Sequence, residues 1–172
     1  MPTSVPPVSL SSKRRCHGIT LIELIVTLVI LSILASAALP YAEMTVRRDN
    51  ELELRRALRE IRTAIDTFHA DWQAGRLPRF SEAASEDGYP KSLEVLVEGV
   101  DLQGVAAKRK YYLRRVPFNP FAEDASEPPA EQWQLRSYQD APDSTLWGGQ
   151  DVYDVRAETD RQAIDGTQYR NW

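Results

Sequence analysis

One carboxylate, Glu23, lies inside a long apolar run, and it is the residue of this sequence that most needs a chemical explanation. The run extends from Ile19 to Leu39 and contains no other charged side chain. An acidic side chain at bilayer depth costs roughly 2.5 kcal/mol or more, even on lenient insertion scales. No basic residue lies between Ile19 and Met44. Glu23 therefore needs a cation from outside this run.

Residues that could carry out catalysis are sparse. The only histidines are His17 and His69, and there is no phosphate-binding glycine loop, paired-histidine metal motif or G-x-S-x-G nucleophile motif. The single cysteine, Cys16, excludes an intramolecular disulfide and a cysteine-based zinc cluster. A lone histidine on a helix is usually a packing or surface residue. The sequence therefore predicts a protein that is not an enzyme.

The apolar run itself has the dimensions of a membrane anchor. Its 21 residues would form a helix of about 31 Å, close to the hydrocarbon thickness of a bilayer. Lys13, Arg14 and Arg15 precede the run, and no acid precedes Glu23. The positive-inside tendency predicts a single pass with a cytoplasmic N-terminus. A plain anchor of this kind leaves Glu23 unexplained.

A cleaved secretory signal is an alternative interpretation of the same segment. The basic Lys13–Arg15 region, the apolar stretch and the small residues Ala35, Ser36 and Ala37 resemble the three parts of such a signal. Cleavage there would release a soluble periplasmic protein. Against this, Glu23 interrupts the apolar region, and the run exceeds the usual length of about 7–15 residues.

The segment Gly18-Ile19-Thr20-Leu21-Ile22-Glu23 resembles the prepilin signature of type IV pilins and of the pseudopilins of type II secretion. The resemblance implies that a prepilin peptidase cuts between Gly18 and Ile19, that the new α-amine of Ile19 is N-methylated, and that the apolar run is retained. Glu23 then becomes the fifth residue of the mature chain. An α-amine is cationic near neutral pH, and methylation keeps the charge.

In the filament that this resemblance implies, Glu23 of one subunit faces the amine of Ile19 on a neighbour. A wrong axial displacement would leave both charges buried and unpaired, at a cost of several kcal/mol for each. The pair would therefore set the register of assembly. Pro40 stands where many pilins carry a helix-kinking proline, and proline removes a backbone donor and clashes with the preceding turn. A simple helix boundary at Pro40 explains the sequence equally well.

An amphipathic helix is predicted over residues 40–74. Its apolar residues recur at spacings of three and four and place one stripe on a helix, whereas arginines and glutamates occupy mostly other faces. Gly75 is a plausible stop. The stripe consists of Leu54, Leu58, Ile61, Ile65, Phe68 and Trp72.

Residues 75–172 are predicted to form the globular domain from many short elements. Lys91–Val97 is predicted as a short helix, and Gln132–Tyr138 and Gln150–Arg156 are predicted as strands because apolar and polar residues alternate there. Ala122–Gln132 is an acidic, proline-containing loop. Three segments resemble the G-type major pseudopilin: Tyr89–Val97, Tyr111–Phe121, and parts of Asp151–Trp172.

Resemblance to the G-type branch also implies a calcium site in the C-terminal loop. Calcium takes six to eight oxygen ligands. Arg156 and Arg161 lie among the acids of this loop, and ion pairs or an acidic surface loop are the competing interpretation. The candidate ligands are Asp151, Asp154, Glu158, Asp160 and Asp165.

The resulting prediction is an α+β, pilin-like fold in which a long N-terminal helix, half membrane and half amphipathic, packs on a small antiparallel sheet. The predicted parts are a leader (1–18), a transmembrane and filament-core helix (19–39), its amphipathic continuation (40–74) and a periplasmic domain (75–172). Without Lys13, Arg14 and Arg15 the 21 basic residues fall to 18 against 25 acids, a net charge of −7 that disfavours nucleic acid.

The predicted function is that of a pseudopilin in the inner membrane, which assembles into a periplasmic pseudopilus of type II secretion. Its expected partners are copies of itself, other pseudopilins, the prepilin peptidase, the lipid bilayer, and the assembly platform with its secretion ATPase. A major or minor pilin of a type IV pilus is the first alternative, although the disulfide-closed loop common in pilins is absent. A soluble periplasmic domain is the second.

Overall fold

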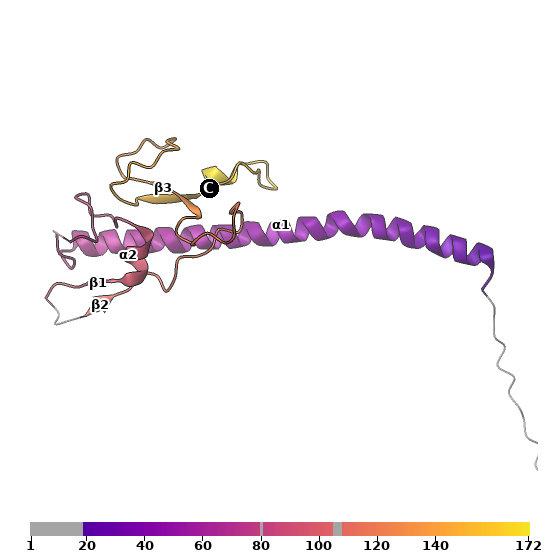
Figure 1. Cartoon of the computed structure of the whole chain (residues 1–172), viewed down its shortest axis with the longest axis horizontal. Coiled ribbons are helices and arrows are strands. Elements are labelled where there is room, and N and C mark those ends of the chain that lie inside the picture. The colour runs from indigo at the N-terminus through magenta and orange to yellow at the C-terminus, as the bar shows by residue number, and fades with distance from the viewer. Residues whose placement is uncertain (1–18, 80, 105–107) are drawn as a thin grey trace, which may run out of the picture. The chain divides into compact units, whose positions relative to one another are not determined.

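The structure is a computed structural model that describes residues 19–79, 81–104 and 108–172. The chain forms two compact units, Met1–Glu43 and Met44–Trp172. Helix α1 (Leu21–Gln73) runs through the end of the first unit into the second (Figure 1). Each unit is described by itself.

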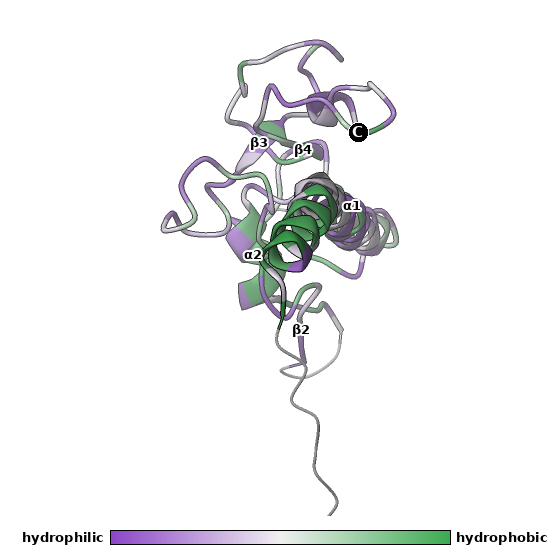
Figure 2. Cartoon of the chain, turned by 90° about the vertical axis from the view of Figure 1, so that its right-hand side faces the viewer, coloured by the Kyte–Doolittle hydropathy of each residue, from purple (hydrophilic) through white to green (hydrophobic). Residues whose placement is uncertain are grey.

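The first unit presents its apolar side chains to the outside. Every side chain from Ile19 to Ser36 is exposed, and the N-terminal end of α1 that faces the viewer in Figure 2 is mostly hydrophobic. Among residues 19–79, 81–104 and 108–172, no helix combines the length and apolar content needed to cross a bilayer. The span predicted for Ile19–Leu39 therefore stays a prediction.

The core of the second unit is built on the predicted stripe of α1. Leu54, Ile61, Ile65 and Phe68 are completely buried. Leu58 is almost completely buried, and Trp72 is half-buried against the same core. The helix ends at Gln73, two residues before Gly75, whose φ of +69° favours glycine. The helical periodicity of the sequence is thus confirmed as a packing face.

Two small antiparallel sheets lie on different sides of α1, with helix α2 (Leu93–Glu98) between them (Figures 1 and 2). One sheet pairs β1 (Val100–Asp101) with β2 (Arg109–Lys110), and Val100 lies opposite Lys110. The other pairs β3 (Trp133–Arg136) with β4 (Asp154–Ala157). There Trp133 lies opposite Ala157. A 3₁₀ helix, η1 (Tyr169–Asn171), follows near the C-terminus.

The fold class is confirmed as α+β, with differences in detail. Two separate two-stranded sheets are described where one small sheet was predicted. The helix predicted at Lys91–Val97 is α2, and the strand predicted at Gln132–Tyr138 is β3. The strand predicted from Gln150 begins only at Asp154, because Val152 donates its N–H to Pro90 O at 2.7 Å and lies outside the ladder.

The loop before α2 packs tightly on the end of α1. Gly88 has a φ of +83°, and a Cβ built on it would lie 2.3 Å from the Trp72 ring. Tyr89 follows and stacks on His69 with ring centroids 4.1 Å apart. Glycine at position 88 is therefore required both by backbone conformation and by space.

Candidate functional site

The first turn of α1 contains the one acid of the apolar segment. The Glu23 N–H donates to Thr20 Oγ1 at 3.2 Å, and the Leu24 N–H donates to Thr20 O at 3.1 Å. Thr20 therefore acts as the N-cap, and Glu23 occupies the third helical position. A carboxylate in the first turn is also favoured by the helix dipole. Among the described residues, no group donates a hydrogen bond to the Glu23 carboxylate or forms an ion pair with it.

The other polar side chains of this segment are satisfied within the helix. Thr27 donates its hydroxyl to Leu24 O, Ser32 to Leu28 O and Ser36 to Ile33 O, at distances of 2.8–2.9 Å. These bonds hide hydroxyls that would otherwise be costly in an apolar environment. Among the polar side chains of residues 19–36, the Glu23 carboxylate is therefore the one without a hydrogen-bond partner among the described residues.

The other residues of the predicted signature are only partly covered. Gly18 lies outside the described residues, whereas Ile19 is described and is 73% exposed. Pro40 lies within α1, but its side chain is outside the described part of the chain. Cleavage at Gly18, methylation of Ile19 and the kink at Pro40 therefore stay predictions.

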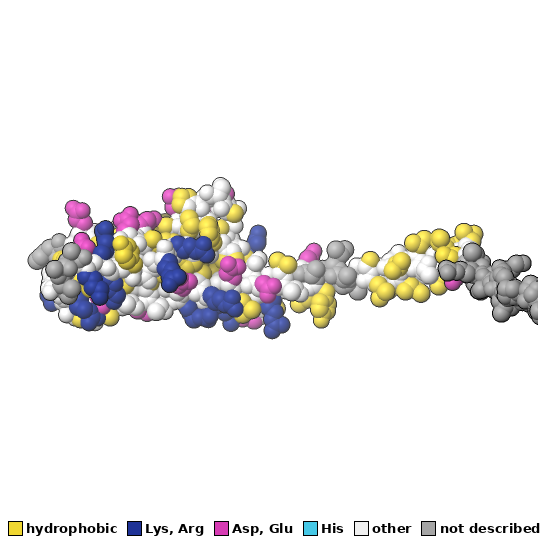
Figure 3. Space-filling view, turned by 90° about the horizontal axis from the view of Figure 1, so that it is seen from below, with side chains coloured by type: hydrophobic (Ala, Val, Ile, Leu, Met, Phe, Trp, Pro, Cys, Tyr) yellow, Lys and Arg dark blue, Asp and Glu magenta, His cyan; other side chains and the backbone are white. Residues whose placement is uncertain are grey.

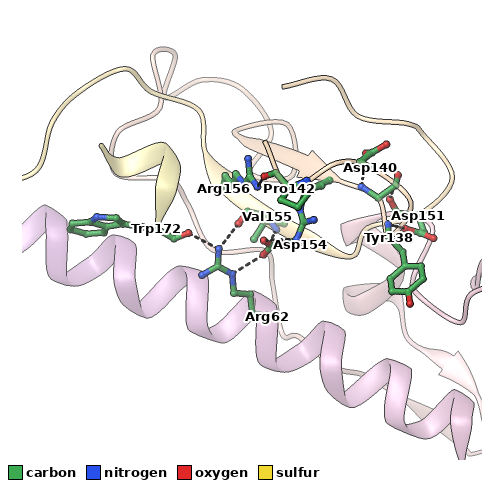
Figure 4. Close-up of polar contacts among 11 residues, drawn as sticks. Arg62, Tyr138, Asp140, Pro142, Asp151, Asp154, Val155, Arg156 and Trp172 are labelled. Atoms are coloured by element: carbon green, nitrogen blue, oxygen red, sulfur yellow. Dashed lines mark hydrogen bonds and ion pairs between the residues drawn. The ribbon is translucent and has the colours of Figure 1, made fainter. Parts of the chain in front are cut away.

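Three of the five predicted calcium ligands are bonded to arginine. Arg62 of α1 donates to Asp154 Oδ1 at 2.8 Å, to Val155 O and to Trp172 O (Figure 4). Asp160 pairs with Arg170. Asp165 Oδ1 accepts a hydrogen bond from the Thr167 N–H, and Asp165 Oδ2 lies 3.9 Å from Arg55 Nη2. These three acids are thus ion-paired, but with Arg62, Arg170 and Arg55 rather than with Arg156 and Arg161.

Asp151 differs from the other candidate ligands because it is 1% exposed and has a buried oxygen, Oδ2, without a hydrogen-bond partner among the described residues. Its Oδ1 accepts the Tyr138 N–H at 2.9 Å. Asp140, in the same loop, accepts the N–H groups of Ser137 and Gly148, which lower the pKa of its carboxyl. Figure 4 shows both acids beside Tyr138.

The five predicted ligands do not converge on one point. Within residues 19–79, 81–104 and 108–172, no group of three or more histidine, cysteine or acidic side chains is arranged to hold a metal ion. Glu158 lines a separate acidic hollow with Asp160. The set as predicted does not fit a calcium site, and calcium binding stays an untested prediction.

His69 has a packing role. Its Nδ1 lies 3.2 Å from Gly88 O and its Nε2 lies 2.8 Å from Gln73 Nε2. Since Gly88 O can only accept and the Gln73 amide can donate, these contacts favour a neutral imidazole protonated at Nδ1. The stack on Tyr89 completes its environment. His69 is thus a structural residue, as the sequence suggested.

The sequence reasoning missed the roles of Thr20 and Arg62. Thr20 and Glu23 have the spacing of a capping box, a pattern that local sequence reveals. Arg62 could not have been found in this way, because its partner Asp154 is 92 residues away. The missed cap matters for the site, since it fixes where the helix begins relative to Ile19.

Comparison with known proteins gives one match. The family model of the prokaryotic N-terminal methylation motif matches residues 13–39. No curated protein and no solved structure matches the chain. The matched motif is that of type IV pilin-like precursors, whose role is structural, and it supports a pilin or a pseudopilin without distinguishing them. It implies processing by a prepilin peptidase, a membrane-anchored precursor and assembly with like subunits.

Proposed function

We propose that this chain is a pseudopilin of a type II secretion system, anchored by a single pass in the inner membrane and assembled into a periplasmic pseudopilus. The observation that carries the proposal is the Glu23 carboxylate. It has no partner among the described residues and lies in the apolar part of α1, whose side chains are exposed over residues 19–36 and which falls within the match of the methylation motif. A cation supplied by another subunit would give this carboxylate its partner.

The mechanism assigns separate tasks to the residues of the first turn. Cleavage after Gly18 frees the α-amine of Ile19, and N-methylation preserves its positive charge. Thr20 caps the helix through its hydroxyl, which leaves the carboxylate of Glu23 available to a neighbouring subunit. Axial misplacement would bury both charges unpaired, so the pair selects one register over the others.

The apolar side chains of the first unit would then pack between subunits. Those of residues 19–36 are all exposed in the single chain, and the large ones are Ile19, Leu21, Ile22, Leu24, Ile25, Val26, Leu28, Val29, Ile30, Leu31, Ile33 and Leu34. Exposed apolar area of this extent needs lipid or protein to cover it. Lipid would cover it before assembly, and neighbouring subunits would cover it in the filament.

Two measurements test the proposal. Mass spectrometry of the mature protein is expected to find a methylated Ile19 at the N-terminus. Glu23→Ala is expected to leave membrane insertion and cleavage intact but to abolish or misregister assembly, because the amine of the neighbour loses its counter-charge. Glu43→Ala, which removes an exposed acid of the same helix beyond the apolar run, is the matched control and should assemble normally.

The alternatives give other results. A mature chain that starts near Ala38 would identify a cleaved secretory signal and a soluble domain. Normal filaments and normal secretion in the Glu23→Ala strain would remove the register mechanism. Deletion of the gene separates a pseudopilin from a pilin. Exported proteins accumulating in the periplasm indicate type II secretion, whereas loss of surface filaments indicates a type IV pilus.

A further inference from the structure

A groove runs between the exposed face of α1 and the segment Lys110–Phe118. It consists of two adjoining hollows of about 590 and 620 Å³, both lined by Glu60 and Arg114. Exposed apolar side chains stand at its edges, namely Leu52 (48% exposed), Tyr111 (62%) and Phe118 (52%). Lys and Arg side chains gather on the face seen in Figure 3. The two hollows together form the arginine groove.

The arginines of the groove lack the partners that other arginines of the unit have. Arg62 and Arg76 bind carboxylates at 2.8 and 2.5 Å. In contrast, the groove arginines are exposed and make no ion pair with any described residue; they are Arg56, Arg59, Arg114 and Arg115. Asp49, Glu53 and Glu60 also line the groove, so its charge is mixed with a small positive excess.

A second surface of the same unit has the opposite character. It is a hollow of about 470 Å³ lined by acids of the loop after Phe121 and of the segment after β4. Its one basic side chain, Arg170, already binds Asp160. Glu123, Glu127 and Glu158 have no ion-pair partner among the described residues. This acidic surface, whose acids are Glu123, Asp124, Glu127, Glu158 and Asp160, shares no lining residue with the arginine groove.

We propose that the arginine groove of one subunit binds the acidic surface of a second copy of this chain. The proposal rests on the proposed function in one respect, namely that assembly brings the globular units of two copies close together. It goes further by naming the lateral contact between those units.

Charge and symmetry favour a second copy over other occupants. Nucleic acid fits poorly, because three acids line the groove and the chain without its basic leader has 18 basic residues against 25 acids. The two surfaces are different patches of one chain, so their contact is heterologous. Repetition of a heterologous contact generates a ring or an open helix. A helical filament is the assembly that the proposed function calls for, and each subunit in its interior can use both patches.

The contact is expected to be weak outside the assembly. Exposed ion pairs contribute little individually and are screened by salt. Leu52, Tyr111 and Phe118 add apolar area, but subunits that are already neighbours pay much less to form the contact than free chains do. The contact therefore orients globular units that the N-terminal helices have brought together.

Cysteine crosslinking in the full-length chain tests the contact. Two differently tagged chains, Arg115→Cys and Asp124→Cys, are expressed together, and Cys16→Ser is introduced in both so that no other thiol reacts. The mixed disulfide dimer is expected to exceed that of the control pair, Arg115→Cys with Glu86→Cys, by about fivefold or more, because Glu86 is an exposed acid outside the acidic surface. Equal yields for the two pairs would overturn the proposal.

Charge reversal gives an independent readout. Arg115→Glu is expected to lower the crosslinking of a Phe118→Cys and Asp124→Cys pair, since like charges then face each other across the contact. Glu127→Arg on the partner chain should restore it. If the double reversal behaves no better than the single one, the charges do not face each other and the proposal fails.

Failure of this contact can be told apart from failure of the proposed function. A methylated Ile19 and normal filaments without the specific crosslink would leave the pseudopilin proposal standing and remove the interface. A specific crosslink in a chain that retains its leader and forms no filament would keep the interface and remove the function.

Discussion

At the scale of single residues, two carboxylates with opposite environments define how the chain uses acids. Glu23 is exposed in an apolar segment and has no partner among the described residues. The Asp71 side chain is 2% exposed and has three hydrogen-bond partners: Arg76, Lys110 and Tyr112. The first is the carboxylate proposed above to bind a neighbouring subunit, and the second holds β2 and the segment after it to the end of α1.

Replacement of Asp71 tests this link. Burial alone would raise the pKa of the Asp71 carboxyl, but hydrogen bonds from Lys110, Tyr112 and Arg76 outweigh burial and hold the pKa below its ordinary value. Asp71→Asn is expected to lower the free energy of unfolding by about 2–3 kcal/mol near neutral pH, because hydrogen bonds to a charged acceptor are lost. Urea unfolding of the detergent-solubilised chain measures this value.

The same substitution has a pH signature. Because the pKa of Asp71 is lower in the folded chain than in the unfolded one, its stabilisation is complete above roughly pH 4, the unfolded value, and is lost as the pH falls through the folded value. The Asn variant should therefore lose less stability than the native chain on acidification in this window. Parallel pH dependences of the two proteins would contradict the assignment. Glu82→Gln, at an exposed acid, is the control.

At the scale of elements, α1 serves as the scaffold to which the short elements of the second unit attach. Its stripe was predictable because helical periodicity is a local property of the sequence, and the same holds for α2 and the centre of β3. The start of β4 was not predictable. Val152 bonds to Pro90 and Asp151 accepts from Tyr138, and such distant partners leave no local pattern. The ion pairs of Arg62 escaped prediction for the same reason.

The contact between the loop at Gly88 and α1 can be tested with two matched glycines. Gly88→Ala is expected to destabilise the unit by about 2–4 kcal/mol, since backbone strain at positive φ and overlap with Trp72 add together. Gly166→Ala has a similar φ of +85° but meets nothing within 4 Å. It should cost only about 1–2 kcal/mol. Thermal unfolding of both variants checks the difference, and equal losses would contradict the packing argument.

The attachment of β4 and the C-terminus to α1 can be tested at Arg62. Arg62→Lys keeps the charge but cannot reach Asp154, Val155 and Trp172 together, because an ammonium lacks the planar fork of a guanidinium. A loss of about 1–2 kcal/mol in unfolding free energy is expected. Arg59→Lys, one turn earlier and without a partner among the described residues, should be neutral in urea unfolding; a comparable loss there would show that the effect is not specific.

At the scale of the whole molecule, the fold class and the N-terminal motif were predictable from the sequence, whereas calcium binding stays an untested prediction. The signature around Gly18 is compact and local, and the methylation motif matches it. The calcium prediction came from a resemblance of the C-terminal loop to that of the G-type pseudopilin. In the fold, Asp154 and Asp160 pair with arginines, and one oxygen of Asp151 has no hydrogen-bond partner among the described residues. Ligand sets are three-dimensional properties, and a list of neighbouring acids does not define one.

Calcium titration tests whether the chain binds calcium. The melting temperature of the full-length chain is measured with increasing calcium chloride, with magnesium chloride as the control. Since arginines occupy Asp154 and Asp160, we expect no calcium-dependent shift through those two residues. A calcium-specific rise that Asp151→Asn abolishes would instead establish a site at Asp151.

The polar network at the beginning of the second unit has a mechanical consequence. Glu51 accepts hydrogen bonds from Ile164 N and Tyr169 Oη, while Arg47 donates to Gln162 O and Tyr169 Oη. A force that pulls α1 along its axis would also load these bonds, because they join the helix to residues 162–169. The C-terminal tail would thus share the tension with the helix, and the unit could be dragged by its helix without unravelling.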